Sequence, residues 1–554
     1  MQELNVKIVN TVKKLYGLEQ AVELTVPDES FGDYSTNIAM KLAKELGKNP
    51  REIAEAIKDE LLSDESIKNI QIAGPGFINF YLTDQSIIES WNLEVPQVYK
   101  NKLVIAEYSD PNAFKALHAG HLYTTLVGNA IANIIESAGA KLYRLNYGGD
   151  VGLHVARAMY GILNKIGGEN PERLKNVPIK ERPLWLSQRY VEGSSAYENN
   201  ENAKIEIEKL NKRIYAIFVD HDKDSKFAQI YWTCRNWSYE GFEELYKSLG
   251  VKPFDEFIPE STVTPLGIKT VESGLKTGIF EKSDGAIIYS EAKSNLHTRV
   301  FITSKGLPLY EAKELGLAVY KWEKYHFDKS LVITANDITE YMKVLFSAMS
   351  NFYPEVEQRT VHLTHGMIKL SGGRKMSSRR GNVLMANDII NDAISANQEL
   401  SGNVDDDIAI GAIKYAFLKQ RLGGDIIYDP EESVSLHGNS GPYLMYAHAR
   451  ARSILEKSNG SSEDIILPLT VYERSLARSL THYNLYLSKS IDDLMPHHIC
   501  TYLYELAQVF NRFYENSKVI GDERESLRIT LVSRYADTLK NGLEILGIKA
   551  PNKM

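Results

Sequence analysis

The sequence predicts an α/β protein whose central domain is a doubly wound parallel sheet of the Rossmann type. The run KLVIAEYS over residues 102–109 is short and apolar, as is typical of a strand buried on both faces. A helical pattern follows over residues 119–137, and a second strand-like run, KLYRLNYGG, begins at Lys141. Strand, helix and strand at this spacing form a βαβ unit, from which doubly wound sheets are built.

The pattern changes along the chain and predicts three domains. Residues 1–95 combine helical stretches with the strand-like run IQIAGPGFINFYLT, and predict a small α+β domain. Residues 96–390 form the sheet domain, which a polar helical insertion interrupts at about 165–260; strand-like runs then return at GAIIYS, HTRVFIT and SLVITAN. Residues 391–554 are helical and predict an all-α bundle.

Composition excludes several classes of protein. No apolar run reaches the ~20 residues that span a bilayer, and the N-terminus lacks the apolar core of a secretory signal. Only Cys234 and Cys500 occur, far apart, so we expect a cytoplasmic protein with no disulfide framework and no metal site. The net charge of −8 argues mildly against nucleic-acid binding, although a long chain can carry a local basic face.

The sharpest motif is His118-Ala119-Gly120-His121, at the turn from the first strand into the first helix of the sheet domain. Two imidazoles at a helix N-terminus suit a bound triphosphate, and Gly120 leaves room for the nucleotide to approach closely. Such a site stabilises charge on the phosphorus during adenylate formation. Alone, the tetrapeptide is equally compatible with structural or metal-binding histidines.

A second motif is a glycine-hinged basic loop that follows the strand-like run THGMIKLS. It is suited to closing over a pyrophosphate leaving group, whereas an arbitrary basic loop is usually only solvated. Its candidate ATP-binding residues are Lys375, Met376, Ser377, Ser378 and Arg379.

Together the two motifs resemble the HIGH and KMSKS motifs of class I aminoacyl-tRNA synthetases, in the same order and at a similar separation. HAGH has Ala119 in place of Ile, and KMSSR has Ser378 where the pattern has its second Lys. Many arginyl-tRNA synthetases lack that Lys and carry one three residues before the first motif, where Lys115 stands here. The resemblance therefore implies that Lys115, His118, His121 and Lys375 are catalytic.

Two further blocks, EYSDPN and NYGGDVG, are similar to the same family. The resemblance implies that arginine is bound by residues of EYSDPN and GLPLYEAKELG, namely Glu107, Ser109, Asn112, Tyr310 and Glu314. A guanidinium has five donors and no acceptor, so its pocket needs carboxylates. The family usually has Asp at position 314 and Gln or His near Ile338; Asp337 is a candidate to compensate for Ile338.

The C-terminal region resembles the anticodon-binding bundle of arginyl-tRNA synthetases, through NSGPYLMYAHAR and LAQVFNRFYENSKVI. Aromatic and polar side chains on such helices bind splayed anticodon bases, and we expect Asn511, Tyr514 and Met554 to contact tRNA. We expect Tyr446, Phe510 and Phe513 to lie in the core of the bundle instead. FGDYSTNIAMKLAK and GPGFINFYL resemble the family's N-terminal domain, which contacts the tRNA elbow.

The resemblance implies an arginine–tRNA ligase that joins L-arginine to tRNA(Arg) through arginyl-adenylate, releasing AMP and pyrophosphate. ATP would enter with Mg²⁺ as a substrate complex, with no tightly bound cofactor, and the family's usual state is a monomer. The alternatives are a class I synthetase for another amino acid, a smaller nucleotidyltransferase, or an inactive relative that only binds tRNA. The helical C-terminal region disfavours the small enzymes, and the absence of zinc ligands disfavours a cysteinyl-type synthetase.

Overall fold

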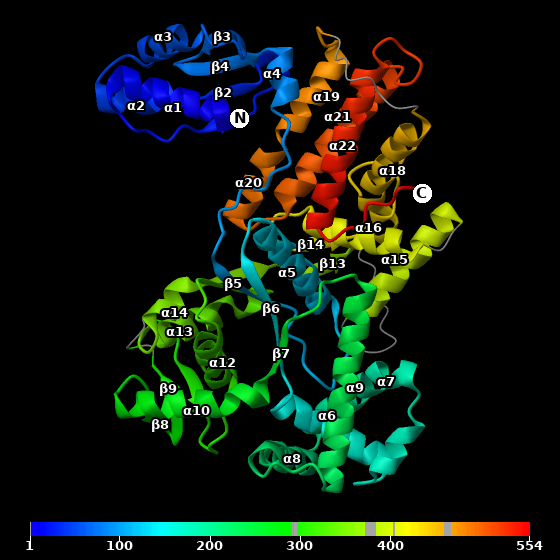
Figure 1. Ribbon diagram of the computed structural model, residues 1–554. Coiled ribbons are helices and arrows are strands. Elements are labelled where there is room, and N and C mark those ends of the chain that lie inside the picture. The colour runs from blue at the N-terminus through cyan, green and yellow to red at the C-terminus, as the bar shows by residue number, and fades with distance from the viewer. Residues whose placement is uncertain (1, 291, 293–295, 372–383, 403–404, 459–466) are drawn as a thin grey trace.

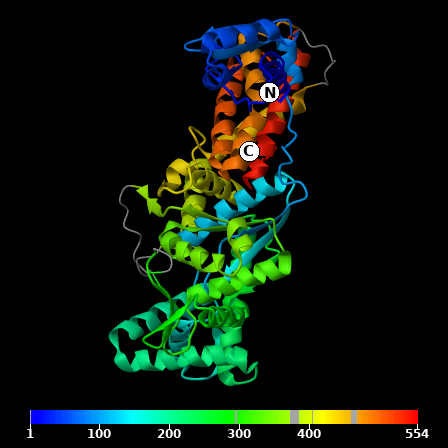
Figure 2. The same ribbon diagram turned by 90° about the vertical axis from the view of Figure 1, so that its left-hand side faces the viewer.

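The computed structural model of the protein describes residues 2–554 except 291, 293–295, 372–383, 403–404 and 459–466. The molecule is elongated (Figures 1 and 2). The N-terminal domain and the C-terminal helices form one end, the parallel sheet lies in the middle, and the insertion forms the other end. No described helix is long and apolar enough to cross a membrane.

The N-terminal domain is an antiparallel sheet with helices packed against it. The sheet has the order β1-β2-β4-β3. The elements are α1 (Gln2–Tyr16), β1 (Leu24–Thr25), β2 (Tyr34–Thr36), α2 (Ile38–Leu46), α3 (Pro50–Leu61), β3 (Ile67–Ala73), β4 (Phe77–Leu82) and α4 (Asp84–Glu89). The predicted Gly-Pro-Gly turn joins two paired strands, β3 and β4.

The central sheet has five parallel strands in the order β12-β11-β5-β6-β7, which is the doubly wound arrangement that the sequence predicts. Its elements are β5 (Leu103–Glu107), α5 (Ala119–Ser137), β6 (Lys141–Gly148), β7 (Glu256–Pro259), β11 (Lys329–Ala335) and β12 (Thr360–His365). The chain winds outward from β5 through β6 to β7, then returns to β11 on the other side of β5. Ligands of such sheets bind beyond the carboxyl ends of the strands at this reversal.

Two of the strand-like runs, GAIIYS and HTRVFIT, do not join the parallel sheet. They form β9 (Ala286–Tyr289) and β10 (Arg299–Ile302) of a separate antiparallel sheet, in the order β10-β9-β8. The elements around it are α10 (Glu260–Lys276), β8 (Glu281–Ser283), α12 (Tyr310–Tyr325), α13 (Thr339–Ser350) and α14 (Pro354–Arg359). Of the three runs, only SLVITAN joins the parallel sheet; it forms β11, which pairs with β5.

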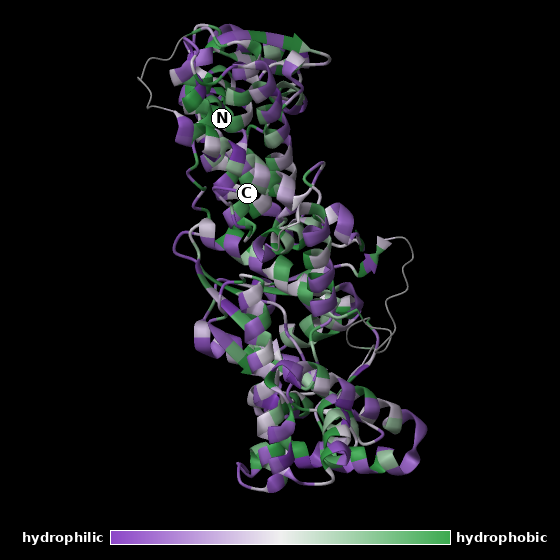
Figure 3. Cartoon of the chain, turned by 90° about the vertical axis from the view of Figure 1, so that its right-hand side faces the viewer, coloured by the Kyte–Doolittle hydropathy of each residue, from purple (hydrophilic) through white to green (hydrophobic). Residues whose placement is uncertain are grey.

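The insertion between β6 and β7 is helical and has its own apolar core. Its helices are α6 (Leu153–Ile166), α7 (Arg182–Asn199), α8 (Glu201–Val219) and α9 (Lys226–Ser248). Hydrophilic and hydrophobic residues alternate along them (Figure 3, bottom), as expected of helices that bury one face. Glycines hold α6 and α7 at backbone contact: a Cβ on Gly193 would lie 1.8 Å from the Arg157 carbonyl oxygen.

The C-terminal part is helical apart from one short parallel strand pair. Its elements are β13 (Ile368–Leu370), α15 (Ala386–Ser401), α16 (Asp406–Leu418), β14 (Ile426–Tyr428), α17 (Pro430–Ser433), α18 (Gly441–Lys457), α19 (Val471–Thr481), α20 (Tyr483–Asp493), α21 (His497–Asn516) and α22 (Glu525–Ile545).

Buried ion pairs join the N-terminal domain to this bundle. Asp33 accepts two hydrogen bonds from Arg474, at 2.9 and 3.1 Å, and lies 3.3 Å from Nε of Arg478. Arg474 also binds Asp84 at 3.1 Å. The preceding residue of α19, Glu473, is buried and pairs with Arg524, the N-cap residue of α22, and with Arg528 of its first turn. The first turn of α19 therefore ties the N-terminal domain to the last helix of the chain.

Candidate active site

The two motif histidines form the cap of α5. Nδ1 of His118 accepts the Gly120 backbone N–H at 3.1 Å, and Nδ1 of His121 accepts the His118 backbone N–H at 3.4 Å. A ring nitrogen that accepts a hydrogen bond carries no proton, so each neutral imidazole has its proton on Nε2. The rings lie 3.8 Å apart at 35°, and both Nε2–H groups remain as donors.

Burial keeps these imidazoles neutral. Burial and then the charge of Lys115 lower the pKa of His118, although Asp337 opposes the shift. The pKa of His121 is lowered well below its ordinary value by burial, His118 and Lys115. The site therefore offers an anion two neutral N–H donors, the positive end of α5 and one ammonium.

The predicted role of Gly120, room for the nucleotide to approach, stays a prediction, and the structure adds a second reason for glycine at this position. A Cβ on this residue would lie 2.9 Å from Cε1 and 3.0 Å from Nδ1 of the His118 ring. The space that glycine leaves open is therefore occupied by the capping imidazole. A side chain at position 120 would displace the capping imidazole, so Gly120 favours the observed orientation of His118.

The basic loop lies outside the described residues, and with it Lys375, Met376, Ser377, Ser378 and Arg379. The residues just after it are described and contact the first motif. Ala119 N–H donates to the Leu384 carbonyl at 2.8 Å, and Ala386 N–H donates to the Leu117 carbonyl at 2.9 Å. An antiparallel bridge between His118 and Met385 lies between these two bonds. The two motifs are therefore joined through the backbone.

Two buried ion pairs lie at the carboxyl edge of the sheet. Glu107 is the last residue of β5, and its Oε2 lies 2.6 Å from Nζ of Lys321 on α12. Lys313, also on α12, pairs with Glu260 at the start of α10. All four side chains are at most 5% exposed. These lysines neutralise two of the carboxylates in this region.

Two more carboxylates stand beside them without a cation of their own. Among the described residues, neither Asp110 nor Glu314 forms an ion pair. Burial and then the charge of Glu107 raise the pKa of Asp110 well above its ordinary value. The same two causes, in the same order, raise the pKa of Glu314 to about 8. The region thus holds more carboxylate than its lysines neutralise, so a cationic ligand would stabilise it.

Two tyrosines complete this cluster. Burial raises the pKa of Tyr147 and of Tyr341 well above the ordinary value, and Glu314 and Glu260 add to both shifts. Neither buried hydroxyl has a hydrogen-bond partner among the described residues. We name Asp110, Glu314, Tyr147 and Tyr341 the acidic cluster.

Asn112 and Ser109 lie on the turn after β5. Asn112 pairs with Gly149 in a parallel bridge, which brings the EYSDPN and NYGGDVG blocks together. Ser109 is buried, and its hydroxyl binds Tyr246 and Thr125, each at 2.7 Å. Its side chain is therefore engaged within the protein rather than directed to the acidic cluster.

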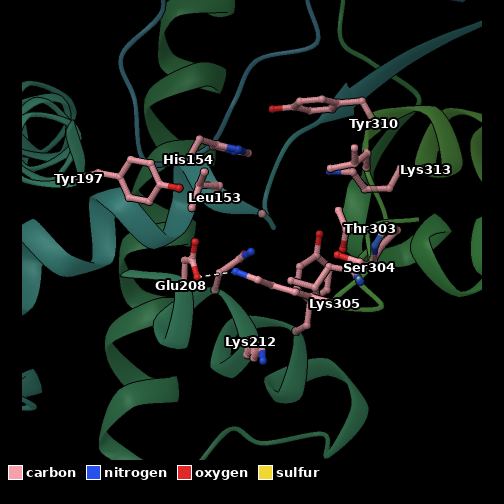
Figure 4. Close-up of a pocket in the computed structure, with 16 residues that line it drawn as sticks. Leu153, His154, Tyr197, Glu208, Lys212, Thr303, Ser304, Lys305, Tyr310 and Lys313 are labelled. Carbon is pink, nitrogen blue, oxygen red and sulfur yellow. Dashed lines mark hydrogen bonds and ion pairs between the residues drawn. The ribbon is translucent and has the colours of Figure 1, made fainter. Parts of the chain in front are cut away.

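Tyr310 lines a cavity of about 350 Å³ between the insertion and α12 (Figure 4). The side chains around it include His154 and Lys313, and Nζ of Lys313 lies 4.4 Å from the centre of the Tyr310 ring. Across the cavity, Lys305 and Glu208 form an ion pair at 2.6 Å. Glu314, one helical turn after Tyr310 on α12, does not line this cavity and belongs to the acidic cluster instead.

Ile338 and Asp337 do not supply the polar contact that the family pattern suggests. Ile338 packs against the apolar core beside the sheet. Asp337 is exposed. Its charge partly opposes the lowering of the pKa of His118 and of His365, and it is not among the causes that shift the pKa values of the acidic cluster. Tyr341, three residues after Ile338, is the polar group that reaches the acidic cluster from this segment.

Sequence reasoning missed Asp110, Tyr147, Tyr341 and the two lysine partners of α12. Asp110, Tyr147 and Tyr341 stand inside blocks that the sequence singles out, EYSDPN, NYGGDVG and NDITEYMKVLF. A signal was therefore present, but no periodicity tells which side chains of a turn converge.

A second surface gathers the residues expected to contact tRNA. Arg450 of α18 donates to Oδ1 of Asn511 at 3.1 Å and lies over the rings of Tyr446 and Tyr514. Met554 lines the same hollow as both tyrosines. We name these five residues the bundle surface.

The prediction for Tyr446 is wrong. This side chain is 38% exposed, because it lies on the face of α18 that turns away from the core. Phe510 and Phe513 are fully buried, as predicted.

Comparisons with known proteins identify the family. Residues 84–429 match the catalytic domain of class I (R) tRNA synthetases, which is more than half of the chain. The chain belongs to the arginyl-tRNA synthetase family. Its flanking parts agree, since residues 2–82 match the arginyl-tRNA synthetase N-terminal domain and residues 444–554 match the DALR anticodon-binding domain.

Relatives within the arginyl-tRNA synthetase family match over almost the full length. The arginine–tRNA ligase of Clostridium perfringens is 30% identical, covering 98% of this chain and 97% of its own. That of Bacteroides thetaiotaomicron is 27% identical over 100% and 99%. The solved arginyl-tRNA synthetase of Thermus thermophilus has the same fold, with a TM-score of 0.83 at 23% identity over the whole of both chains.

Proposed function

We propose that the chain is an arginine–tRNA ligase, which activates arginine with ATP and transfers it to the 3′ end of tRNA(Arg). The observation that carries the proposal is the acidic cluster. Glu107 and Glu260 already have lysine partners, whereas Asp110 and Glu314 form no ion pair among the described residues, and burial and the charge of Glu107 raise the pKa of both. A substrate that brings a delocalised cation with several donors fits this imbalance.

The guanidinium binds Asp110 and Glu314, with the hydroxyls of Tyr147 and Tyr341 as further partners. A guanidinium has five N–H donors in a fixed plane, so it can serve several acceptors at once. Lysine carries its charge on one compact ammonium and leaves part of the cluster unsatisfied. The rest of the arginine lies toward Glu107 and Asn112, and Tyr310 lies on the guanidinium side.

ATP binds at the start of α5. The Nε2–H groups of His118 and His121 donate to phosphate oxygens, and the ammonium of Lys115 supplies positive charge. Lys375 and the residues after it close over the leaving pyrophosphate. Mg²⁺ accompanies the triphosphate rather than occupying a protein cage, and no other cofactor is bound.

The reaction needs no covalent nucleophile from the protein. The arginine carboxylate attacks the α-phosphorus of ATP and pyrophosphate leaves; a terminal ribose hydroxyl of tRNA then attacks the carbonyl carbon and AMP leaves. The rate comes from alignment of the reactants and from donors aimed at the developing phosphate charge.

Transfer RNA binds along the length of the molecule. The exposed aromatic and cationic side chains of the bundle surface suit unstacked anticodon bases. The N-terminal domain contacts the elbow. The enzyme acts as a monomer in the cytoplasm.

Pyrophosphate exchange with each of the twenty amino acids, with and without total tRNA, tests the proposal. We expect exchange with arginine alone, and only when tRNA is present. Exchange with another amino acid would refute the assignment of the acidic cluster to arginine. No exchange with any amino acid, together with measurable tRNA binding, would show that the chain is a non-catalytic relative.

A further inference from the structure

The insertion holds the backbone on both sides of Lys115. Phe114 N–H donates to the hydroxyl of Ser238 on α9 at 2.9 Å, and Ala116 N–H donates to the hydroxyl of Ser187 on α7 at 2.6 Å. Phe114 also has a left-handed backbone, with φ of 64°. A non-glycine residue adopts this conformation only where its surroundings enforce it, so these two bonds fix where Lys115 leaves the chain.

The same helix also contacts the Lys115 side chain. Nζ of Lys115 lies 4.0 Å from the centre of the Tyr190 ring. Tyr190 follows Ser187 by three residues on α7, so both project from one face of the helix. One face of α7 therefore binds the backbone next to Lys115 and supports its ammonium.

The partner is an aromatic ring rather than a carboxylate, which matters for the charge. Among the described residues no Asp or Glu forms an ion pair with Lys115. A carboxylate would neutralise the ammonium, whereas a ring face attracts a cation and leaves its full charge for a ligand. Burial raises the pKa of Tyr190, but Lys115 and neighbouring groups outweigh burial, and the net pKa is lowered.

The position of Tyr190 is fixed by the packing of α7 on α6. The backbone next to this residue touches α6 directly, because a Cβ on Gly161 would lie 2.2 Å from the Arg189 carbonyl oxygen. Gly193, one turn later, is equally close to Arg157. One close backbone contact lies just before Tyr190 and one lies a turn after it. The backbone of Tyr190 therefore cannot move away from α6 unless the two helices separate.

We propose that Tyr190 is a positioning residue for Lys115, which it holds at the phosphate-binding end of α5 during arginine activation. The inference rests on the proposed function. It also assigns a role to the helical insertion. Lys115 belongs to the sheet domain, but the residues that hold its backbone and its ammonium belong to the insertion.

The test compares Tyr190→Leu with Tyr190→Phe, which keeps the ring and removes only the hydroxyl. In tRNA-dependent pyrophosphate exchange we expect Tyr190→Leu to lower kcat/KM for ATP by about 5- to 30-fold, the size of a partly desolvated cation–π contact. Tyr190→Phe should cause a clearly smaller loss than Tyr190→Leu, because it keeps the ring under the ammonium and removes only the contact of the hydroxyl with Lys115. Both variants should keep the KM for arginine, since the acidic cluster is untouched.

A double-mutant cycle separates positioning from a general structural effect. In a Lys115→Met background, Tyr190→Leu should cause no further loss beyond about twofold, because the ammonium it holds is gone. An equal loss in both backgrounds, or a loss in Tyr190→Phe as large as in Tyr190→Leu, would overturn the proposal. Normal thermal unfolding of Tyr190→Leu would verify that the variant folds.

Binding of a non-hydrolysable ATP analogue, measured by calorimetry, keeps this test independent of the proposed function. If wild type shows no exchange, the proposed function fails. If Tyr190→Leu then binds the analogue more weakly than wild type and Tyr190→Phe do, the inference that Tyr190 positions Lys115 still stands. If wild type exchanges arginine and all the Tyr190 variants bind the analogue equally, only the inference about Tyr190 fails.

Discussion

Replacing Glu314 by Gln removes one charge of the acidic cluster while keeping its shape. Burial and Glu107 raise the pKa of Glu314 to about 8, so at pH 7 about one tenth of the free protein carries this carboxylate in ionised form. Under the proposed function, arginine binds the ionised form. The affinity of the protein for arginine should therefore rise about tenfold between pH 7 and pH 9, because Glu314 is already ionised in most of the free protein at pH 9.

The sign follows from the direction of the shift. A raised carboxyl pKa means that the neutral acid dominates below pH 8, and a bound cation lowers that pKa again. Arginine binding at pH 7 should therefore release about 0.9 proton from Glu314. In Glu314→Gln the share of this release that comes from Glu314 should be lost, whereas burial and Glu107 still raise the pKa of Asp110.

The affinity itself should fall sharply in the variant. Removing one partner of a buried, hydrogen-bonded charge pair costs about 2–5 kcal/mol, which corresponds to at least about 30-fold weaker arginine binding at pH 9. Glu314→Asp, which keeps the charge on a shorter side chain, is the matched control and should retain the pH dependence.

Titration calorimetry of arginine in two buffers of different ionisation enthalpy measures affinity and proton release together. If Glu314→Gln bound arginine with wild-type affinity and the same proton release, the acidic cluster would not be the guanidinium site. Lysine, titrated in parallel, should bind weakly to all three proteins.

Three further predictions concern other parts of the molecule. Lys115→Ala should slow adenylate formation about 100-fold with little change in arginine affinity, measured by rapid quench; equal loss of ATP-independent arginine binding would indicate misfolding instead. Gly193→Ala should lower the melting temperature, because its Cβ would lie 1.8 Å from the Arg157 carbonyl oxygen; an unchanged melting curve would show that α6 and α7 separate easily. Tyr514→Ala should raise the KM for tRNA about tenfold at constant KM for ATP, in steady-state charging assays; an unchanged KM for tRNA would remove the bundle surface from the anticodon contact.

Local patterns predicted the elements of the sheet domain well. The helix over residues 119–137 and the strands beside it follow from apolar spacing, because a buried strand and the helix that covers it impose their own periods on the sequence. The same patterns did not tell which sheet a strand joins. GAIIYS and HTRVFIT read like SLVITAN, but pairing partners are set by tertiary contacts.

The site was predictable where a motif fixes its own geometry. His118 and His121 cap the helix that follows them, so their placement is local. The acidic cluster is not local: Asp110 and Glu314 are distant in sequence, and their excess charge is visible only once Lys321 and Lys313 are seen to be engaged elsewhere. No reading of single positions could have paired Lys115 with a residue of the insertion.

The pairing of Asp33 with Arg474 and Arg478 has a consequence for the choice of RNA. Since Asp33 is buried and each guanidinium has more than one partner, these contacts oppose any change in the distance between the N-terminal domain and the bundle. Under the proposed function these two parts hold the elbow and the anticodon of one RNA. If that distance is kept, the two parts together would fit only RNA molecules whose elbow and anticodon lie equally far apart, so the length of the RNA would contribute to its selection alongside its bases.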